Sequence, residues 1–376
     1  MAVFIHDTHI ISPLGYSTEA NFNALLQGKS AIKEVFINDS CGTIFAGKID
    51  DASFEDHFKT IDNSFDGSRI EKLLIAALHP LIQDTKRNDR IVLILSTTKG
   101  NISALAQDDL EQAFITNLAQ NINTYFQFKT EPIVVSNACV SGVMALSIAK
   151  RFIEMDAFDA AYIIAVDELT PFVVSGFQSF QAMSSEPCKP YDAARTGVNL
   201  GESAVAVYVS NQAKESSVLI AGDANINDAN HISGPSRTGE GLVLSIEKAM
   251  NEAQVNSENV DYISAHGTAT LFNDEMEAIA FNRTNLQTVP VNSLKGYFGH
   301  TLGASGLLES VLTIESLKQG VLVPSLGFET PGTSQPLNII TEKITKELNV
   351  ALKTASGFGG SNSAMIFIKN HGLCTQ

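Results

Sequence analysis

The sequence predicts an α/β protein in which mainly parallel sheets are covered by helices, and three observations lead to that fold class. Short runs rich in β-branched and apolar residues alternate with stretches of helical periodicity. Glycine-rich turns separate them, as in strand–helix–strand units. With 376 residues, the chain is long enough for two domains or for one large duplicated α/β unit.

Each element is justified by its own pattern. The apolar run at the N-terminus is predicted to be a first strand, because His6 and Asp7 interrupt it and no basic leader precedes it. Further strands are predicted at 91–96, 133–136, 161–166, 204–210, 218–221, 262–265 and 364–368, where short apolar runs end in turn residues. Helices are predicted at 70–83, 108–122, 140–155, 241–253, 274–282 and 304–318, where apolar residues recur at helical spacing.

A polar stretch near the middle of the chain divides these elements into two groups. Residues 210–217 (SNQAKESS) lose the apolar periodicity of their neighbours. We therefore predict two similar halves, residues 1–212 and residues 213–376.

Composition excludes several classes of function. The formal net charge of −16 argues against nucleic acid and anionic membrane surfaces, which both attract basic proteins. No apolar run approaches the ~20 residues that cross a bilayer. The four cysteines are scattered without disulfide or CxxC spacing. These features predict a cytoplasmic protein from a reducing compartment.

Cys139 is the first candidate for chemistry. It follows the strand predicted at 133–136 and precedes a helix in EPIVVSNACVSGVMALSIAKRF. A helix N-terminus presents free N–H groups and positive potential, so we expect a lowered thiol pKa and a nucleophilic role. By itself, the same pattern also fits a buried cysteine that only packs.

Two histidines occupy equivalent places in the second half. His266 ends the strand predicted at 262–265, and His300 follows another strand and a glycine-flanked turn in VPVNSLKGYFGHTLGASGLLES. Ligand sites of open α/β sheets form at such carboxyl ends. Either histidine alone is compatible with a purely structural role.

A thiol with two imidazoles suits carbon–carbon bond formation better than hydrolysis, which uses one histidine with an orienting carboxylate or amide. The thiol would carry an acyl group as a thioester, and two N–H donors would stabilise the enolate that forms when a malonyl thioester loses CO2. The GFGGSN loop at 357–362 can bring a backbone N–H to the acyl carbonyl beside that of Cys139.

Several motifs together resemble the β-ketoacyl-acyl carrier protein synthases of the thiolase superfamily. They are SNACVSG, KPYDAARTGVNLGES, DANHISGPS, AHGTAT, NSLKGYFGHTLGASGLLE and GFGGSN. Their order and spacing match over most of the chain. The resemblance implies a thiolase-like five-layered αβαβα fold built from two similar halves. It also implies a homodimer or related heterodimer, and decarboxylative Claisen condensation with malonyl-acyl carrier protein.

The resemblance also implies roles for individual residues. Cys139 is the acylated nucleophile, and His266 and His300 handle the malonyl unit. Lys295, five residues before His300, resembles the family's supporting lysine, and Glu309 its carboxylate partner.

Further residues match the family around the substrate. Phe358 resembles the gating phenylalanine, whose backbone N–H is the second oxyanion donor. Thr268 and Thr270 resemble threonines of the pantetheine channel. No bound cofactor or metal is implied, because the substrates travel on the phosphopantetheine of acyl carrier protein.

Departures from the family pattern bear on the substrate rather than on the reaction. The region 54–90 is shorter than usual, Lys99 lies where the family has a small segment near the acyl pocket, and KTAS precedes GFGG in place of a usual Asn and Phe. An enzyme of fatty acid synthesis and one of a specialised polyene or polyketide pathway both remain open.

Two other functions are less compatible with the sequence. A chain-length-factor-like partner subunit that does not elongate would typically lack the nucleophile. A degradative thiolase would need a second catalytic cysteine, and Cys374 lies beyond the last strand.

Acyl carrier proteins are acidic, so docking one on this acidic chain requires a local group of positively charged side chains. Arg69 directly precedes the helix predicted at 70–83, and Lys72 lies in its first turn. Because they are three residues apart, they project to one face. We predict that they dock the carrier, with the basic cluster Lys86, Arg87 and Arg90 as the next candidate.

Overall fold

The computed structural model of the chain describes residues 1–82, 88–228 and 234–370. An 11-stranded sheet runs through it in the order β13-β11-β10-β15-β16-β9-β1-β8-β6-β4-β5. The strands are β1 (Phe4–Ile11), β4 (Ile91–Ser96), β5 (Ile133–Val135), β6 (Ala160–Asp167), β8 (Ser203–Ser210), β9 (Val218–Asn227), β10 (Tyr262–Ser264), β11 (Pro290–Asn292), β13 (Asn338–Ile339), β15 (Val350–Gly357) and β16 (Ser361–Lys369).

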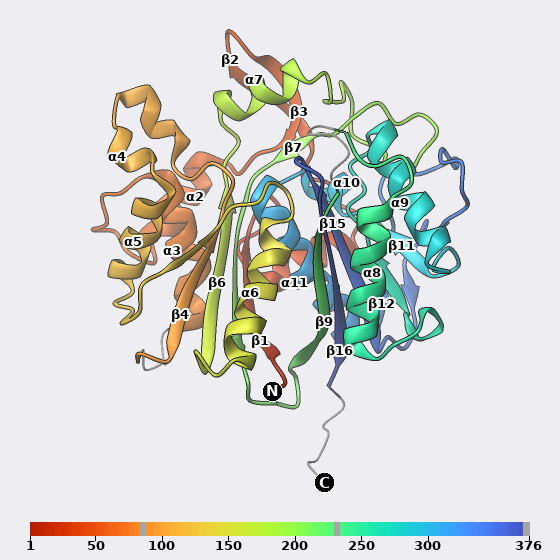
Figure 1. Cartoon of the computed structure of the whole chain (residues 1–376). Helices are drawn as coiled ribbons and strands as arrows, with labels where there is room; N and C mark the ends of the chain where they lie inside the picture. The colour runs from red at the N-terminus through yellow and green to blue at the C-terminus, as the bar shows by residue number, and fades with distance from the viewer. Residues whose placement is uncertain (83–87, 229–233, 371–376) are drawn as a thin grey trace.

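The sheet divides into two halves where β1 meets β9. These strands pair only through Phe4 and Ile5, with Leu219 and Val218 opposite. Away from this joint the two halves separate, and helices fill the space between them (Figure 1).

Six long helices complete five layers. One pair packs outside the first half-sheet, one pair lies between the half-sheets, and one pair packs outside the second (Figure 1). They are, in that order, α3 (Arg69–Ile82) and α5 (Ile115–Tyr125), α6 (Ser141–Glu154) and α11 (Ser305–Gln319), and α8 (Glu240–Ala253) and α9 (Leu271–Arg283).

Alternation along the buried strands explains the layers. In β6, Ile163 joins the central hydrophobic cluster between the half-sheets, whereas Ile164 joins the outer cluster with α3 and α5. In β16, Phe367 joins the central cluster and Ile366 the outer cluster with α8 and α9. Successive side chains of a strand point to opposite faces, so each half-sheet must be covered twice. The predicted αβαβα fold is confirmed.

The prediction of mainly parallel sheets was wrong for the middle of the sheet. β4 pairs in parallel with β5 and β6, and β10 with β11 and β15. The central strands β8, β1, β9 and β16 pair antiparallel with their neighbours. One reason is that the GFGG loop joins β15 directly to β16 as a hairpin, a connection that only antiparallel strands allow.

The helix predicted at 108–122 is also corrected. The chain forms η1 (Ile102–Gln107), α4 (Leu110–Ala113) and then α5, because Asp108 takes a left-handed conformation and Phe114 an extended one. Elements without a strong periodic pattern were not predicted. They are the strands β13 and β15 of the large sheet and, outside it, α1 (Thr18–Leu26), β2 (Lys33–Asn38), β3 (Gly42–Gly47), α2 (Asp51–Lys59), α7 (Pro171–Ser179), β7 (Leu200–Gly201), η2 (Ser257–Asn259), α10 (Lys295–Phe298), η3 (Leu302–Ala304), β12 (Val321–Leu322) and β14 (Ile344–Thr345).

A close crossing of the central helices positions the site. A Cβ on Gly142 of α6 would clash with the backbone N of Leu307, and one on Gly306 of α11 would lie 2.8 Å from the backbone N of Val143. The crossing brings the N-termini of both helices together, at the turns that carry Cys139 and His300. Among the described residues, no helix is both long and apolar enough to span a membrane.

Candidate active site

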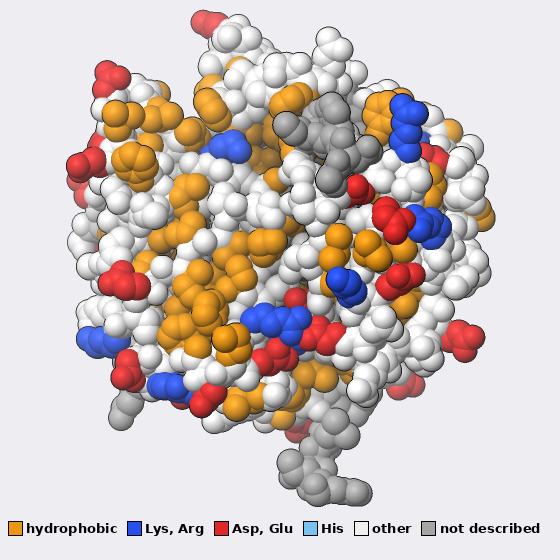
Figure 2. Space-filling view, viewed as in Figure 1, with side chains coloured by type: hydrophobic (Ala, Val, Ile, Leu, Met, Phe, Trp, Pro, Cys, Tyr) orange, Lys and Arg blue, Asp and Glu red, His pale blue; other side chains and the backbone are white. Residues whose placement is uncertain are grey.

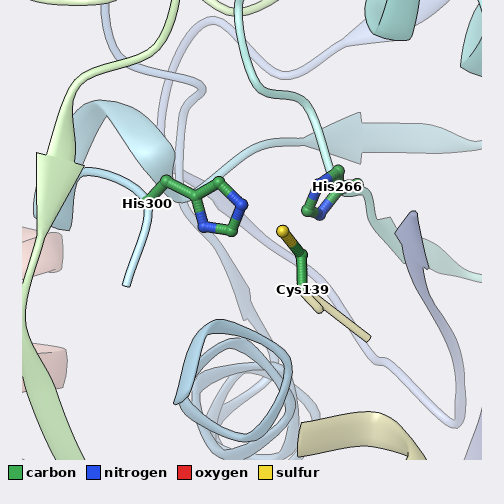
Figure 3. Close-up of side chains that lie close together, drawn as sticks. All are labelled: Cys139, His266 and His300. Atoms are coloured by element: carbon green, nitrogen blue, oxygen red, sulfur yellow. The ribbon is translucent and has the colours of Figure 1, made fainter. Parts of the chain in front are cut away.

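Cys139 lies in a tight turn between β5 and α6. Ala138 takes a positive φ of 43°, which is uncommon outside glycine. Ser141 stabilises the turn, since its Oγ accepts from the N–H of Asn137 at 2.7 Å and donates to the carbonyl of Ala138 at 2.6 Å. The turn directs the buried thiol toward His266 and His300 (Figure 3).

The resting thiol is protonated, which corrects the expected lowered pKa. Burial raises the pKa of Cys139 to about 11, and Asp167 and Glu309 add to this, while Lys295 and Lys99 oppose it. The helix N-terminus was expected to dominate, but removal of a thiolate from water outweighs the favourable charges in this buried position.

His266 is held through its own backbone. Its N–H and that of Gly267 donate to the two carboxylate oxygens of Glu277, at 2.8 and 2.7 Å. Its carbonyl accepts from Nζ of Lys295 at 2.9 Å. The turn after β10 is therefore fixed at three atoms, and the imidazole emerges from a rigid base.

His300 is held in a second, independent way. Its backbone N–H donates to Asn199 O at 2.7 Å, and its carbonyl accepts from the N–H of Gly201 at 3.0 Å. The N–H of Leu302 donates to its Nδ1 at 3.2 Å. Because Nδ1 accepts this hydrogen bond, the ring proton of neutral His300 resides on Nε2.

The three side chains converge (Figure 3). One ligand atom from each of Cys139, His266 and His300 lies within 4.8 Å of the other two, and all three residues are buried. The imidazole rings stand nearly perpendicular, with centroids 5.2 Å apart and an interplanar angle of 82°. Nδ1 of His266 and Nε2 of His300 have no hydrogen-bond partner, although both are buried. Such atoms are available to a bound substrate.

Both imidazoles are neutral at pH 7. Burial lowers the pKa of His300 to about 3, and Lys295 acts in the same direction. Burial likewise lowers the pKa of His266 well below its ordinary value, with Lys295 again second. A cysteine and two histidines are also possible metal ligands. However, a metal on Nε2 of His300 would require its proton to move to Nδ1, which already accepts from Leu302.

Glu309 is the acidic centre beneath the site. Its Oε1 accepts from Nζ of Lys295 at 2.5 Å and from Oγ of Ser305 at 2.9 Å, and its Oε2 lies 2.6 Å from Nζ of Lys353. Burial alone would raise the pKa of Glu309, but the two lysines hold it at about 2. The structure thus brings Lys295 and Glu309 together as predicted, one layer behind the histidines.

Lys353 was missed as a site residue. It is fully buried in β15. The signal was present, because a lysine inside an apolar strand must find a buried partner. From the sequence, KTAS was interpreted only as a departure from the family pattern.

Asp167 was missed too. At the end of β6 it accepts from Thr97 Oγ1 at 3.0 Å, from Thr98 Oγ1 at 2.9 Å and from the N–H of Gly303 at 2.6 Å. Burial raises the pKa of Asp167, and these hydrogen bonds oppose the rise. Asp167 thereby fixes the η3 turn, whose Leu302 N–H sets the tautomer of His300.

A cavity of about 470 Å³ opens onto the three side chains. Its lining includes Thr268, Thr270 and Phe358, together with Phe177 and Phe180 at the end of α7. The hydroxyls of the two threonines lie 2.9 Å apart. The predicted substrate-binding residues therefore share one cavity with the predicted nucleophile.

Phe358 lies at the tip of the β15–β16 hairpin and is 39% exposed. Its ring packs against Phe177 and Phe180, with centroids 6.1 and 5.4 Å away. A Cβ on Gly357 would lie only 3.1 Å from the backbone N of Cys139. The loop therefore packs directly against the backbone of the turn that carries the nucleophile.

Arg69 and Lys72 do not form an open basic rim. Arg69 pairs with Asp51 at 2.8 Å, Glu168 at 3.0 Å and Glu202 at 2.7 Å. Lys72 pairs with Glu55 at 3.0 Å. Both positive charges are matched within the chain, which argues against the docking role that their spacing predicted.

Lys99 and Arg90 do not line the cavity, although the charge of Lys99 acts on the Cys139 thiol. Lys99 follows β4, and its backbone N–H donates to Asp167 at 3.3 Å. Arg90 pairs with Asp156 and Asp159. Lys86, Arg87, Cys374 and part of the DANHISGPS motif lie outside the described residues.

Comparisons with known proteins agree with this arrangement. Residues 3–215 match the model of the beta-ketoacyl synthase N-terminal domain, and residues 217–329 that of the C-terminal domain. The 3-oxoacyl-[acyl-carrier-protein] synthase 2 of Vibrio harveyi is 26% identical, over 96% of this chain and 96% of the relative. That of Rhizobium meliloti is 30% identical, over 62% of this chain and 59% of the relative.

Solved structures share the fold. The ketosynthase (ApeO) in complex with its chain length factor (ApeC) from Xenorhabdus doucetiae aligns with a TM-score of 0.86 at 23% identity. The alignment covers 98% of each chain. A beta-ketoacyl synthase from Burkholderia phymatum aligns with a TM-score of 0.85 at 24% identity, over 98% of this chain and 99% of the other.

Proposed function

The chain belongs to the β-ketoacyl synthase family, and from this we propose that it uses Cys139, His266 and His300 to condense an acyl thioester with malonyl-acyl carrier protein. Such an enzyme is an acyltransferase, a 3-oxoacyl-[acyl-carrier-protein] synthase. The observation that carries the assignment of residues is the convergence of one buried thiol and two neutral imidazoles in a single cavity.

Acylation of Cys139 comes first. The sulfur attacks the carbonyl of the incoming thioester, and the tetrahedral oxyanion accepts hydrogen bonds from the backbone N–H groups of Cys139 and Phe358. The C–S bond to the carrier then breaks, and the thiol proton ends on the departing pantetheine sulfur. A neutral imidazole beside the thiol can relay this proton, because both histidines are unprotonated at pH 7.

Condensation follows. The malonyl thioester loses CO2, and the electron pair of the broken C–C bond remains as an enolate. The Nε2–H of His300 points a donor into the cavity, and His266 supplies the second. The enolate carbon attacks the acyl carbonyl, and the C–S bond to Cys139 breaks with its electron pair on sulfur. The thiolate then takes up a proton from solvent to restore the resting thiol, and a 3-oxoacyl thioester leaves on the carrier.

The substrates arrive on the phosphopantetheine of acyl carrier protein, so no resident cofactor is needed. Thr268 and Thr270 present adjacent hydroxyls at the cavity wall. We assign them to the pantetheine arm, which carries amide groups that hydroxyls can bind.

A dimer is the proposed assembly. Along α6, Met144, Ile148, Phe152 and Met155 keep solvent contact and repeat at helical spacing. Figure 2 shows hydrophobic side chains gathered on the face where α6 lies in Figure 1. Strand β5 beside this face is the edge of the sheet. An apolar stripe next to an open edge suits pairing with an identical chain or a related subunit.

The alternative is a non-elongating partner subunit, similar to a chain length factor. The intact Cys139 and both histidines favour the condensing enzyme. The acyl substrate is open between fatty acid synthesis and a polyketide or polyene pathway.

Mass spectrometry can test both points. The protein is incubated with a panel of acyl-carrier thioesters, and the acyl group trapped on Cys139 is identified. An adduct on Cys139 that malonyl-acyl carrier protein discharges to a 3-oxoacyl product is expected. A chain that never becomes acylated with any substrate would instead be a partner subunit.

A further inference from the structure

Lys353 is a second buried cation in a site where one carboxylate already has a lysine partner. It lies in β15, between Ser264 of β10 and Met365 of β16. Lys295 and Lys353 together carry two positive charges, and two buried carboxylates face them: Glu309 lies between the two lysines, and Glu277 of α9 acts on Lys353 from the other side of the His266 turn. A buried charge is costly unless it is paired, so each member of this cluster depends on the others.

The two lysines divide the carboxylate between them. Oε2 of Glu309 faces Lys353, which leaves Oε1 to Lys295 and Ser305. Because Nζ of Lys295 is held at Oε1 of Glu309, it can also donate to the carbonyl of His266.

The lysines also hold the backbone that delivers His266. Nζ of Lys353 lies 3.3 Å from Ser264 O and 3.4 Å from Ala265 O, while Lys295 binds His266 O at 2.9 Å. Three successive carbonyls therefore accept from two buried ammonium groups. Lys353 additionally donates to Thr354 O at 2.7 Å, which ties the cluster to the strand leading to Phe358.

We propose that Lys353 is a positioning residue for the decarboxylation step. It fixes Glu309 and the strand end that carries His266, and it supplies the buried positive charge that favours the developing enolate. Acylation of Cys139 depends mainly on the oxyanion N–H groups and is affected much less. This proposal rests on the proposed function and adds a residue to its second step.

The charge of Lys353 has a separate consequence for pH dependence. The groups that act on the two imidazoles are Lys295, Lys353 and Glu309, besides each other. Removal of one cation raises the pKa of both histidines. The loss of activity on acidification therefore moves to higher pH, a change that simple loss of packing would not produce.

The test compares Lys353→Met with a matched control, Lys150→Met. Lys150 is also a buried lysine, paired with Asp223 at 3.1 Å and Glu252 at 2.7 Å, outside the cavity. Two readouts are taken on the full chain. Acylation is followed with a saturated acyl-pantetheine thioester, and CO2 release from malonyl-pantetheine is followed in a Cys139→Gln background.

We expect Lys353→Met to slow CO2 release roughly tenfold, less than the ~10²–10³ lost with a direct donor. We also expect the fall in CO2 release on acidification to begin at a higher pH in this variant than in its parent. The rate of Cys139 acylation should stay within about twofold of that of the unsubstituted chain. Lys150→Met should leave both reactions unchanged. Equal CO2 release in Lys353→Met and its parent, or an equal loss of both reactions at every pH, would overturn the proposal.

If Lys353→Met does not fold, Lys353→Met/Glu309→Gln also neutralises the carboxylate whose Oε2 has lost its partner, and the same slow decarboxylation is expected of it. Failure of the proposed function would look different. In that case the unsubstituted chain would neither acylate Cys139 nor release CO2 in the Cys139→Gln background.

Discussion

At the scale of single residues, protonation state decides what the site can do. A protonated thiol lies beside two neutral imidazoles, so the same histidines can relay a proton during acylation and donate hydrogen bonds during decarboxylation. Triosephosphate isomerase uses a neutral imidazole as a donor in the same sense. Here burial, reinforced by Lys295, keeps the rings neutral.

The role of Cys139 is directly testable. We expect Cys139→Ala to abolish acyl transfer and condensation while the fold is retained, because the proposed mechanism makes the sulfur the covalent carrier. Intact-mass analysis after incubation with an acyl thioester should show one adduct on the unsubstituted chain and none on the variant. Condensation by the variant, or an adduct on Cys41 or Cys188, would contradict the assignment.

The histidines can be separated from the thiol. Cys139→Gln should retain malonyl decarboxylation, and His266→Ala or His300→Ala in that background should lower it by about 10²–10³, the typical loss of one oxyanion donor. The decarboxylation rate of Cys139→Gln with both histidines intact should not change as pH falls from 7 to 5, because the pKa of His300 is about 3. Release of CO2 is the measurement. If both histidine variants release CO2 as fast as the Cys139→Gln parent, the two histidines have a structural role and not a catalytic one.

At the scale of elements, two close contacts align the site. The crossing of α6 and α11 at Gly142 and Gly306 sets the distance between the turns of Cys139 and His300. Asp167 then joins the end of β6 to the η3 turn. The catalytic atoms thus depend on backbone contacts between elements far apart in sequence.

The helix crossing gives a prediction with an internal control. A Cβ at Gly142 meets backbone atoms of α11, so Gly142→Ala should lower the free energy of unfolding by about 1–3 kcal/mol. A Cβ at Gly176 of α7 would meet nothing within 4 Å, so Gly176→Ala should be neutral or slightly stabilising. Denaturant unfolding of both variants checks this. Equal unfolding midpoints for Gly142→Ala and Gly176→Ala would show that the two helices move apart at little energetic cost.

Arg69 joins the start of α3 to Glu202, the residue between β7 and β8. Its guanidinium contacts Glu202, which is completely buried, so Arg69→Met leaves that carboxylate uncompensated. We expect a loss of roughly 3 kcal/mol in unfolding free energy, as for other broken buried pairs. Lys72→Met removes an ion pair with the exposed Glu55 and the contact of Nζ with the Phe58 ring, 5.6 Å from its centroid, and its effect should stay at about 1 kcal/mol or below.

Lys72→Met also tests whether this residue docks the carrier. Stopped-flow binding at low salt should give equal association rates for Lys72→Met and the unsubstituted chain, because Lys72 is already neutralised by Glu55. A slower rate that recovers with salt would restore the docking role predicted from the sequence.

At the scale of the whole molecule, one strand joins the two halves, and His6, one of its two histidines, links stability to pH. His6 of β1 bonds Ser210 of β8 at 2.9 Å through Nε2. Burial lowers the pKa of His6 to about 4. Between pH 6.5 and 4 the unfolded chain binds a proton at His6 and the folded chain does not, so this residue makes stability fall as pH falls.

We therefore expect His6→Gln to reduce the difference in unfolding free energy between pH 7 and pH 5 by about 1 kcal/mol, after allowance for partial contact with solvent. Denaturant titrations of both chains at the two pH values measure this. An unchanged difference would place the acid sensitivity in other groups.

Local patterns predicted much of this protein. The βαβα order and most long helices follow from strand ends, glycine turns and helical spacing. The same patterns made Cys139, His266 and His300 candidates, and the motif resemblance selected them over a purely structural role. Lys295 and Glu309 came from motif resemblance, and the structure joins them by an ion pair. These features depend on neighbours close in the chain, where sequence and conformation are directly coupled.

Tertiary structure decided what depends on distant contacts. Whether strands pair parallel or antiparallel, whether Arg69 meets solvent or Glu202, and whether Lys353 meets Glu309 are all set by elements far away in sequence. The pKa of Cys139 belongs to the same class. The sequence alone determined where the thiol lies, at the start of a helix, but the burial that raises its pKa arises only when both half-sheets close around it, because desolvation depends on the whole packed surroundings.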